Sequence, residues 1–174
     1  MLDIIQLGEE VLREKCKEVT KFDDSLRILT EAMIEAMDEA DGVGLAGPQV
    51  GVPERLFVAH VPQMEPMVFI NPSIIETSLE TCPYEEGCLS IPGFFHEVVR
   101  PERVTVQAQD VKGKAFTIQA TGLLARIIQH ENDHLDGMLF IDHLSERERE
   151  KIVRAFERRS KTAKVFKRKH KRER

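Results

Sequence analysis

The fold is organised around the stretch Gln129-His130-Glu131-Asn132-Asp133-His134-Leu135-Asp136-Gly137. Positions four residues apart lie on one face of an α-helix, so His130 and His134 can point at a common metal ion. Glu131, one residue after the first histidine, flanks the coordination position that stays open. This His-Glu-x-x-His arrangement is typical of metal-dependent hydrolases. A pair of solvated surface histidines is the alternative until a third ligand is found.

Residues 123–135 are predicted to form the helix that carries both histidines, and Gly137 is predicted to end it. Its apolar members are Leu123, Leu124, Ile127, Ile128 and Leu135. A helix of this composition is expected to be largely buried. Buried imidazoles need polar partners, and a bound metal ion would supply them.

A chain of 174 residues, 41% of them hydrophobic, is long enough to bury the core of one domain. We expect a single domain over residues 1–160 and a basic C-terminal extension over residues 161–174. No apolar run approaches the roughly 20 residues that span a bilayer, so no membrane partner is expected. The N-terminus has no basic region before an apolar core, and the three cysteines are too few for a disulfide framework. These features predict a cytoplasmic protein.

The net charge of −5 conceals a division between the two ends of the chain. Residues 147–174 hold 14 Lys and Arg against 4 Asp and Glu, a net charge of +10, which leaves −15 for residues 1–146. A basic segment of this kind is attracted to polyanions whatever charge the rest of the molecule carries. A nucleic-acid-binding protein with a structural metal is therefore one interpretation, although structural zinc sites usually have four protein ligands.

The other segments show helix and strand patterns. Residues 25–40 have apolar positions spaced by three and four residues, as in an amphipathic helix that Asp23 or Asp24 caps. A last helix is predicted from about Ser145. Short strands are predicted over residues 56–59, 67–70, 95–100, 103–109 and 115–120. We therefore expect an α+β fold, in which small antiparallel β-sheets pack around the central metal-binding helix and a C-terminal helix and basic extension follow.

Glycine is concentrated in residues 42–51, Gly-Val-Gly-Leu-Ala-Gly-Pro-Gln-Val-Gly, which formally contain the dinucleotide-binding pattern Gly-x-Gly-x-x-Gly. That pattern requires a strand before it and a helix after it. Here a helix comes before, and Pro48, Gly51 and Pro53 oppose a helix after. A tight turn and a loop whose backbone approaches a ligand are the two remaining interpretations.

Cys88 is the candidate third ligand, because a catalytic metal site needs three protein ligands and an open position for water. It lies in the turn-rich stretch Glu86-Gly87-Cys88-Leu89-Ser90. An isolated cysteine is usually a small buried hydrophobic residue. Residues 42–51, 86–90 and 129–137 together, in this order, closely resemble the three signature motifs of the peptide deformylase family: Gly-x-Gly-x-Ala-x-x-Gln, Glu-Gly-Cys-x-Ser and Gln-His-Glu-x-x-His. Gly47 departs from the family, which usually has alanine there, and is expected to loosen the loop.

The resemblance covers residues 12–144 and implies a role for each matching residue. The ligands of one divalent metal ion would be Cys88, His130 and His134. A thiolate with two imidazoles suits zinc and Fe(II) alike, and the resemblance implies iron as the native ion, with zinc or nickel in other members. Glu131 would be the catalytic acid and base, and Gln49 with the backbone N–H of Leu89 would donate to the developing oxyanion.

The reaction that the resemblance implies is removal of the formyl group from the N-terminal formyl-methionine of nascent polypeptides. Gly44 would contact the substrate through its backbone, and we assign the pocket for the methionine side chain to Val43, Leu123 and Ile127. The basic tail would hold the enzyme near the ribosome, where ribosomal RNA offers phosphates. A metallopeptidase that cleaves internal peptide bonds is the rival enzyme, but its third ligand would normally lie downstream of the histidines.

Overall fold

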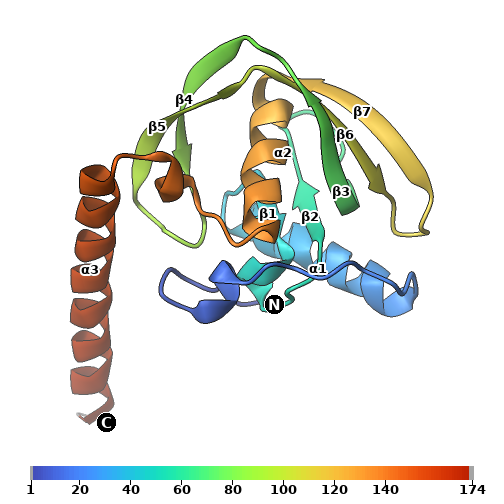
Figure 1. Ribbon diagram of the computed structural model, residues 1–174. Helices are drawn as coiled ribbons and strands as arrows, with labels where there is room; N and C mark the ends of the chain where they lie inside the picture. The colour runs from blue at the N-terminus through green and yellow to red at the C-terminus, as the bar shows by residue number, and fades with distance from the viewer. Residues whose placement is uncertain (1, 173–174) are drawn as a thin grey trace. The chain divides into compact units, whose positions relative to one another are not determined.

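The computed structural model describes the backbone of residues 2–172 and the side chains of residues 2–162. It divides into two compact units, Met1–Phe140 and Ile141–Arg174, which are described separately. The first unit contains the helices α1 (Asp24–Glu39) and α2 (Gly122–Leu135), together with all the strands of the described residues (Figure 1). The predicted division of the chain at residue 160 stays a prediction.

Five strands form an antiparallel sheet in the order β1-β2-β3-β6-β7. Their bounds are Gly44–Ala46, Leu56–Ala59, Met67–Thr77, Arg103–Gln109 and Ala115–Thr121. The strands β4 (Thr81–Gly87) and β5 (Phe95–Pro101) form a separate two-stranded antiparallel sheet. Helix α2 packs against β1, β2, β6 and β7 and lies beneath the arch of strands in Figure 1. The predicted α+β fold, with small antiparallel sheets around the histidine-bearing helix, is confirmed.

Strand β2 is buried on both faces, which explains its uninterrupted apolar sequence. Phe57 and Ala59 belong to a core cluster that includes apolar side chains of α2. Leu56 and Val58 belong to a second cluster, which includes apolar side chains of α1. Because successive side chains of a strand point to opposite faces, this part of the sheet lies between the two helices. Core packing therefore fixes α2, and with it the two histidines, against the sheet.

Most predicted elements are present with small shifts of their ends, but β3 runs to Thr77, seven residues beyond the strand predicted over residues 67–70. Asp23 caps α1, since its carboxylate accepts a hydrogen bond from the backbone N–H of Leu26 at 3.1 Å. The glycine-rich stretch, expected to be a turn or loop, instead forms β1 and the short 3-10 helix Gly47–Val50. Strand β1 exists because it pairs with β2, a contact between distant residues that local glycine content does not reveal. Strand β4 was not predicted, because Pro83 and two adjacent glutamates interrupt any strand pattern.

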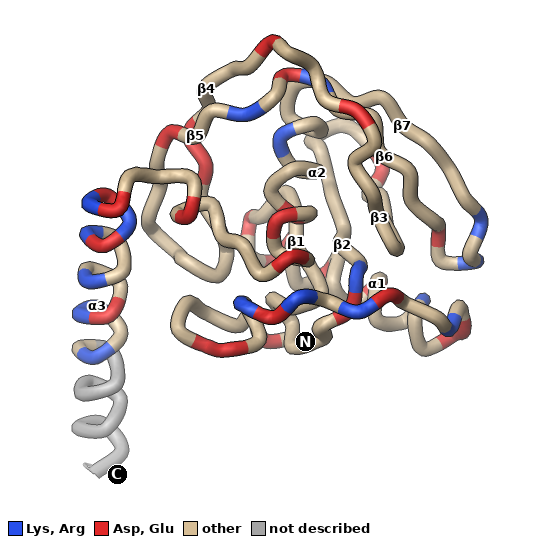
Figure 2. The backbone as a smooth tube through the Cα atoms, viewed as in Figure 1, with Lys and Arg blue, Asp and Glu red and all other residues tan. Residues whose placement is uncertain are grey.

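The second unit carries α3 (Glu146–Arg172), which begins directly after Ser145, as predicted. Ser145 and Glu148 form a reciprocal cap: Glu148 N donates to Ser145 Oγ at 3.3 Å, and Ser145 N donates to Glu148 Oε2 at 3.2 Å. Figure 2 shows acidic and basic residues mixed along the described part of this helix. Nearly all of the predicted basic extension, residues 161–174, lies outside the described side chains. Within residues 2–172, no helix is both long and apolar enough to cross a membrane.

Candidate metal and catalytic site

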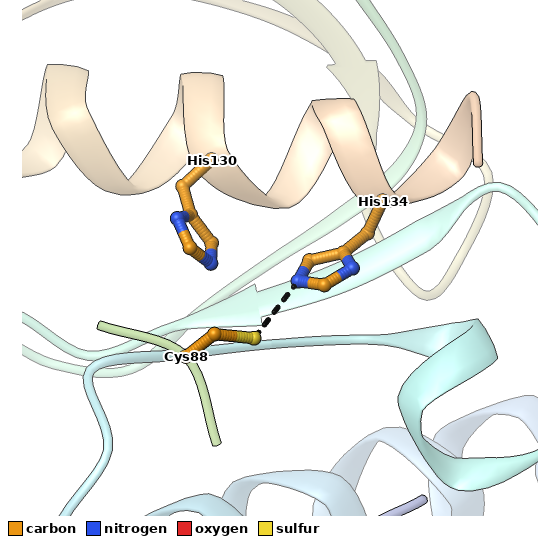
Figure 3. Close-up of side chains that lie close together, drawn as sticks. All are labelled: Cys88, His130 and His134. Atoms are coloured by element: carbon orange, nitrogen blue, oxygen red, sulfur yellow. Dashed lines mark hydrogen bonds between the residues drawn. The ribbon is translucent and has the colours of Figure 1, made fainter. Parts of the chain in front are cut away.

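Helix α2 directs His130 and His134 towards Cys88, which directly follows strand β4 (Figure 3). The candidate ligand atoms of these three residues all lie within 4.8 Å of one another. Cys88 Sγ and His134 Nε2 lie 3.4 Å apart, within hydrogen-bond distance. The structure therefore brings together the three predicted ligands, although 42 residues separate Cys88 from His130 in the sequence.

These residues fit a divalent metal ion of borderline softness. One sulfur and two imidazole nitrogens are donor types that zinc and Fe(II) take in proteins. Burial lowers the pKa of His134 well below its usual value, which favours the neutral imidazole that a ligand must be. At His130, burial is outweighed by hydrogen bonds with Cys88 and Glu86, which raise the pKa, so metal binding there would displace a proton. In the described part of the chain the group has three such donors, whereas a structural zinc site usually has four. The donor set is therefore of the catalytic type.

Glu131 lies beside this cluster on α2 and is buried, with 4% of its surface exposed. Burial raises the pKa of its carboxyl group to about 7. Its Oε2 atom is buried and has no protein hydrogen-bond partner among the described residues. General acid-base catalysis is most effective when the pKa of the catalytic group lies near the working pH. This carboxyl group is therefore suited to accept and return a proton near neutral pH.

Gly44 makes room for the Glu131 carboxylate. A Cβ atom at Gly44 would lie 2.9 Å from both Glu131 Cδ and Ile127 Cγ2. Such distances require the neighbouring atoms to move. The glycine was predicted to contact the substrate through its backbone, and the structure gives it a second function, which is to leave space for the side chains of Glu131 and Ile127 on α2.

Gln49 is held with its amide nitrogen directed at Cys88. Its Oε1 accepts from the backbone N–H of Ala46 at 2.8 Å, which assigns the other end of the amide as nitrogen. Nε2 donates to Ser90 Oγ at 3.1 Å and lies 3.5 Å from Cys88 Sγ. The side chain is almost fully buried. A fixed, buried donor is what stabilisation of an oxyanion requires.

Gly47 does not loosen the segment that carries Gln49, contrary to the expectation from sequence. A Cβ atom at Gly47 would lie 2.6 Å from the backbone oxygen of Val52 and 2.9 Å from that of Glu54. The segment closes on itself, with Val52 N donating to Gly47 O at 3.0 Å. Gly47 therefore allows the backbone of Val52 and Glu54 to pack directly against this position.

A cavity of about 480 Å³ opens beside the cluster. Its lining includes nine of the ten predicted site residues: Val43, Gly44, Gln49, Cys88, Leu89, Leu123, Ile127, His130 and Glu131. The tenth, His134, is buried and outside this lining. The apolar residues assigned to the methionine side chain thus share one cavity with the polar groups. Sequence reasoning missed three aromatic residues that also line it, Tyr84, Phe94 and Phe95.

Glu86 had no predicted role, although it begins the motif that contains Cys88. It accepts hydrogen bonds from His130 Nδ1 at 2.9 Å and from Arg100 Nε at 2.6 Å. Burial disfavours its ionised form, but His130 and Arg100 outweigh this and hold the pKa of Glu86 below its usual range. The carboxylate fixes Nδ1 as the protonated nitrogen of His130 and leaves Nε2 for a metal ion.

Arg126 is a further residue that sequence reasoning missed, and it also binds Glu86, with Arg126 Nη1 at 2.8 Å from Glu86 Oε1. A signal for it was present in the sequence. It is a charged residue within the apolar stretch of residues 123–128, and it lies four positions before His130, on the same face of the helix.

Comparison with known proteins identifies the family of the chain. The family model described as polypeptide deformylase matches residues 1–150. The chain is 48% identical to the peptide deformylase of Borreliella burgdorferi over 158 residues, which cover 90% of this chain and 96% of that protein. It is 45% identical to the peptide deformylase of Rhizobium meliloti over 163 residues, which cover 91% and 94% of the two chains. The crystal structure of a peptide deformylase from Legionella pneumophila matches with a TM-score of 0.88 and 42% identity, covering 94% of this chain and 97% of the other. The chain therefore belongs to the polypeptide deformylase family.

Proposed function

We propose that the chain removes the formyl group from the N-terminal formyl-methionine of nascent polypeptides, using one divalent metal ion bound by Cys88, His130 and His134. Membership of the family supports the reaction. The observation that carries the metal-dependent mechanism is the grouping of one thiol and two imidazoles within 4.8 Å, beside the buried carboxyl of Glu131.

When bound, the metal ion supplies Lewis-acid chemistry, lowering the pKa of water and polarising the formyl carbonyl. Glu131 takes a proton from the water that attacks the formyl carbon. It then delivers this proton to the nitrogen, which leaves as the free amine of methionine while formate is released. Gln49 Nε2 and the backbone N–H of Leu89 donate to the developing oxyanion, and one such donor typically contributes about 3–4 kcal/mol.

The substrate occupies the cavity beside the cluster. Its methionine side chain contacts Val43, Leu123 and Ile127, and its backbone contacts Gly44. Support for this assignment comes from the lining of the cavity, which these four residues share with Glu131. The proximity of Gly44 to the Glu131 carboxylate supports a substrate contact at this backbone, close to the proposed acid-base group.

The native ion in this proposal is iron, with zinc and nickel as alternatives, because the donor set suits each of them. The enzyme acts in the cytoplasm, and the basic extension binds the ribosome through RNA phosphates. Residues 161–174 contain eight Lys and Arg against one Glu, which supports an electrostatic role. Deleting them should weaken ribosome affinity and reduce its salt dependence, and an unchanged affinity would contradict this part of the proposal.

Glu131→Gln tests the mechanism. The variant should keep its metal content by elemental analysis and lose formate release from formyl-Met-Ala by about 10²- to 10⁴-fold. Near-normal turnover would exclude the role assigned to Glu131. Met-Ala without the formyl group and longer peptides serve as control substrates, because cleavage of their peptide bonds would indicate a metallopeptidase instead.

A further inference from the structure

We propose that Arg126 is a positioning residue for the metal site, which holds the hairpin that presents Cys88 against the helix that carries both histidines. The inference rests on the proposed metal site. Strands β4 and β5 lie outside the five-stranded sheet. Backbone hydrogen bonds hold the base of the hairpin (Glu102 N to Glu80 O, 2.9 Å) and the loop after Cys88 (Leu7 N to Ser90 O, 2.9 Å), so side-chain contacts fix the hairpin on α2 between these two points.

Arg126 reaches from α2 to both strands of the hairpin. Its Nη2 donates to the backbone oxygen of Cys82 in β4 at 2.7 Å, and its Nη1 donates to that of Val98 in β5 at 3.0 Å. Nη1 also donates to Glu86 Oε1 at 2.8 Å. The ring of Tyr84, also in β4, lies 5.6 Å from the guanidinium. One buried side chain therefore contacts the hairpin at four places.

The positions of the Cys88 thiol and of the His130 imidazole both depend on the contacts of Arg126. Cys88 directly follows β4, so a shift of this strand relative to α2 moves the sulfur. Glu86 lies two residues before Cys88 and accepts from His130 Nδ1 at 2.9 Å. The same shift would therefore remove the carboxylate that orients one imidazole while displacing the thiol.

Arg100 binds the same carboxylate, Glu86, but projects from the hairpin rather than from α2. It belongs to β5 and binds Glu86 through Nε at 2.6 Å and through Nη2 at 3.0 Å. Its Nη1 donates to Asp133 Oδ2 of α2 at 2.8 Å. When Arg126 is removed, Glu86 keeps this cation, so the buried carboxylate stays paired and the fold is expected to survive. What is lost are the bonds from Arg126 to the backbone of both strands, so β4 loses its bond to Cys82 O, while Gln129 of α2 still donates to Pro101 O of β5 at 2.9 Å.

Arg126→Met tests the proposal, because methionine keeps an unbranched apolar side chain and removes every donor. Metal-free protein is titrated with Co²⁺, and the dissociation constant and the thiolate-to-Co²⁺ charge-transfer absorption are measured. Loss of a residue that orients metal ligands typically lowers metal affinity by about 10- to 100-fold. We expect a loss of this size together with a weaker or shifted charge-transfer band. Arg126→Lys retains one charged donor and should recover part of the affinity.

Leu26→Ala is the control for a general loss of stability, since it truncates a buried side chain of α1, in the other core cluster. The proposal is wrong if Arg126→Met lowers the unfolding midpoint as this control does but leaves the Co²⁺ affinity and the absorption band unchanged. If Arg126→Met does not fold, Arg126→Lys decides the question by the same two measurements. Wild-type protein that binds no Co²⁺, or Cys88→Ser protein that binds it with wild-type affinity, would contradict the metal site itself.

Discussion

The carboxylate of Glu131 occupies the space that a side chain at Gly44 would fill. A Cβ atom at Gly44 would come within 2.9 Å of Glu131 Cδ. This relationship joins two of the sequence motifs, because Gly44 belongs to the glycine-rich stretch and Glu131 to the histidine-bearing helix. The small residue in the first motif thus sets where the carboxyl group of the last motif can lie.

Gly44→Ala should therefore impair catalysis rather than folding or metal binding. The added methyl group displaces Glu131 or Ile127, and a misplacement of about 1 Å can cost about 100-fold in rate. We expect kcat/KM for formyl-Met-Ala to fall by about this factor, with metal content unchanged. Glu35→Ala is the control, since it changes an exposed residue of α1 that does not line the cavity. Wild-type kcat/KM in Gly44→Ala would contradict the inferred crowding.

Local pattern and motif resemblance predicted different parts of the site. The pairing of His130 with His134 followed from helical spacing, which is a local property. Cys88 and Gln49 could be assigned only through the resemblance, because the contacts that bring them to α2 join residues far apart in the sequence. The five-stranded sheet was largely predictable, since β2, β6 and β7 have apolar patterns of their own.

The network around Glu86 could not be predicted in the same way. Strand β4 has an unfavourable sequence and is held by Arg126 from a helix 40 residues later. The expectation drawn from a single glycine was also wrong. Gly47 suggested a loose loop, because nothing local indicated that the backbone oxygen of Val52 would lie against it.

Gly47→Ala restores the residue that the family usually has, yet it should destabilise this protein. A Cβ atom would press on the backbone oxygens of Val52 and Glu54, which belong to a closed segment and have little room to move. Overpacking of this kind typically costs about 1–3 kcal/mol. Urea unfolding of the metal-free protein should show a decrease of that size in the free energy of unfolding. An unchanged or increased stability would mean that the segment relaxes freely.

Glu86→Gln should destabilise the protein even without metal. Its carboxylate is 3% exposed and lies between Arg100 and Arg126, so the substitution leaves two buried guanidinium groups without their shared anion. Removing one partner from a buried ion pair typically costs about 3–5 kcal/mol. Glu85→Gln is the matched control, because it changes the preceding, exposed residue of the same strand. Equal urea midpoints for the two variants would contradict the importance of the buried network.

His60 and Asp38 form an ion pair between the end of β2 and α1. His60 Nδ1 lies 2.8 Å from Asp38 Oδ1. The hydrogen bond to Asp38 raises the pKa of His60 above its usual value. A group with a raised pKa in the folded state adds stability that is fully present below the unfolded-state pKa and is lost as the pH rises through the folded-state pKa.

Asp38→Asn should therefore lower the urea midpoint at pH 6 and have little effect at pH 9. At pH 6 the histidine is protonated in the folded wild type and interacts with the carboxylate, whereas at pH 9 it is neutral and the carboxylate contributes little. Unfolding curves of both proteins at the two pH values measure this difference directly. Glu39→Gln changes the neighbouring exposed carboxylate of α1 and should show no such pH dependence. A loss of stability in Asp38→Asn that is equal at pH 6 and pH 9 would show that Asp38 acts through packing or helix contacts and not through the charge of His60.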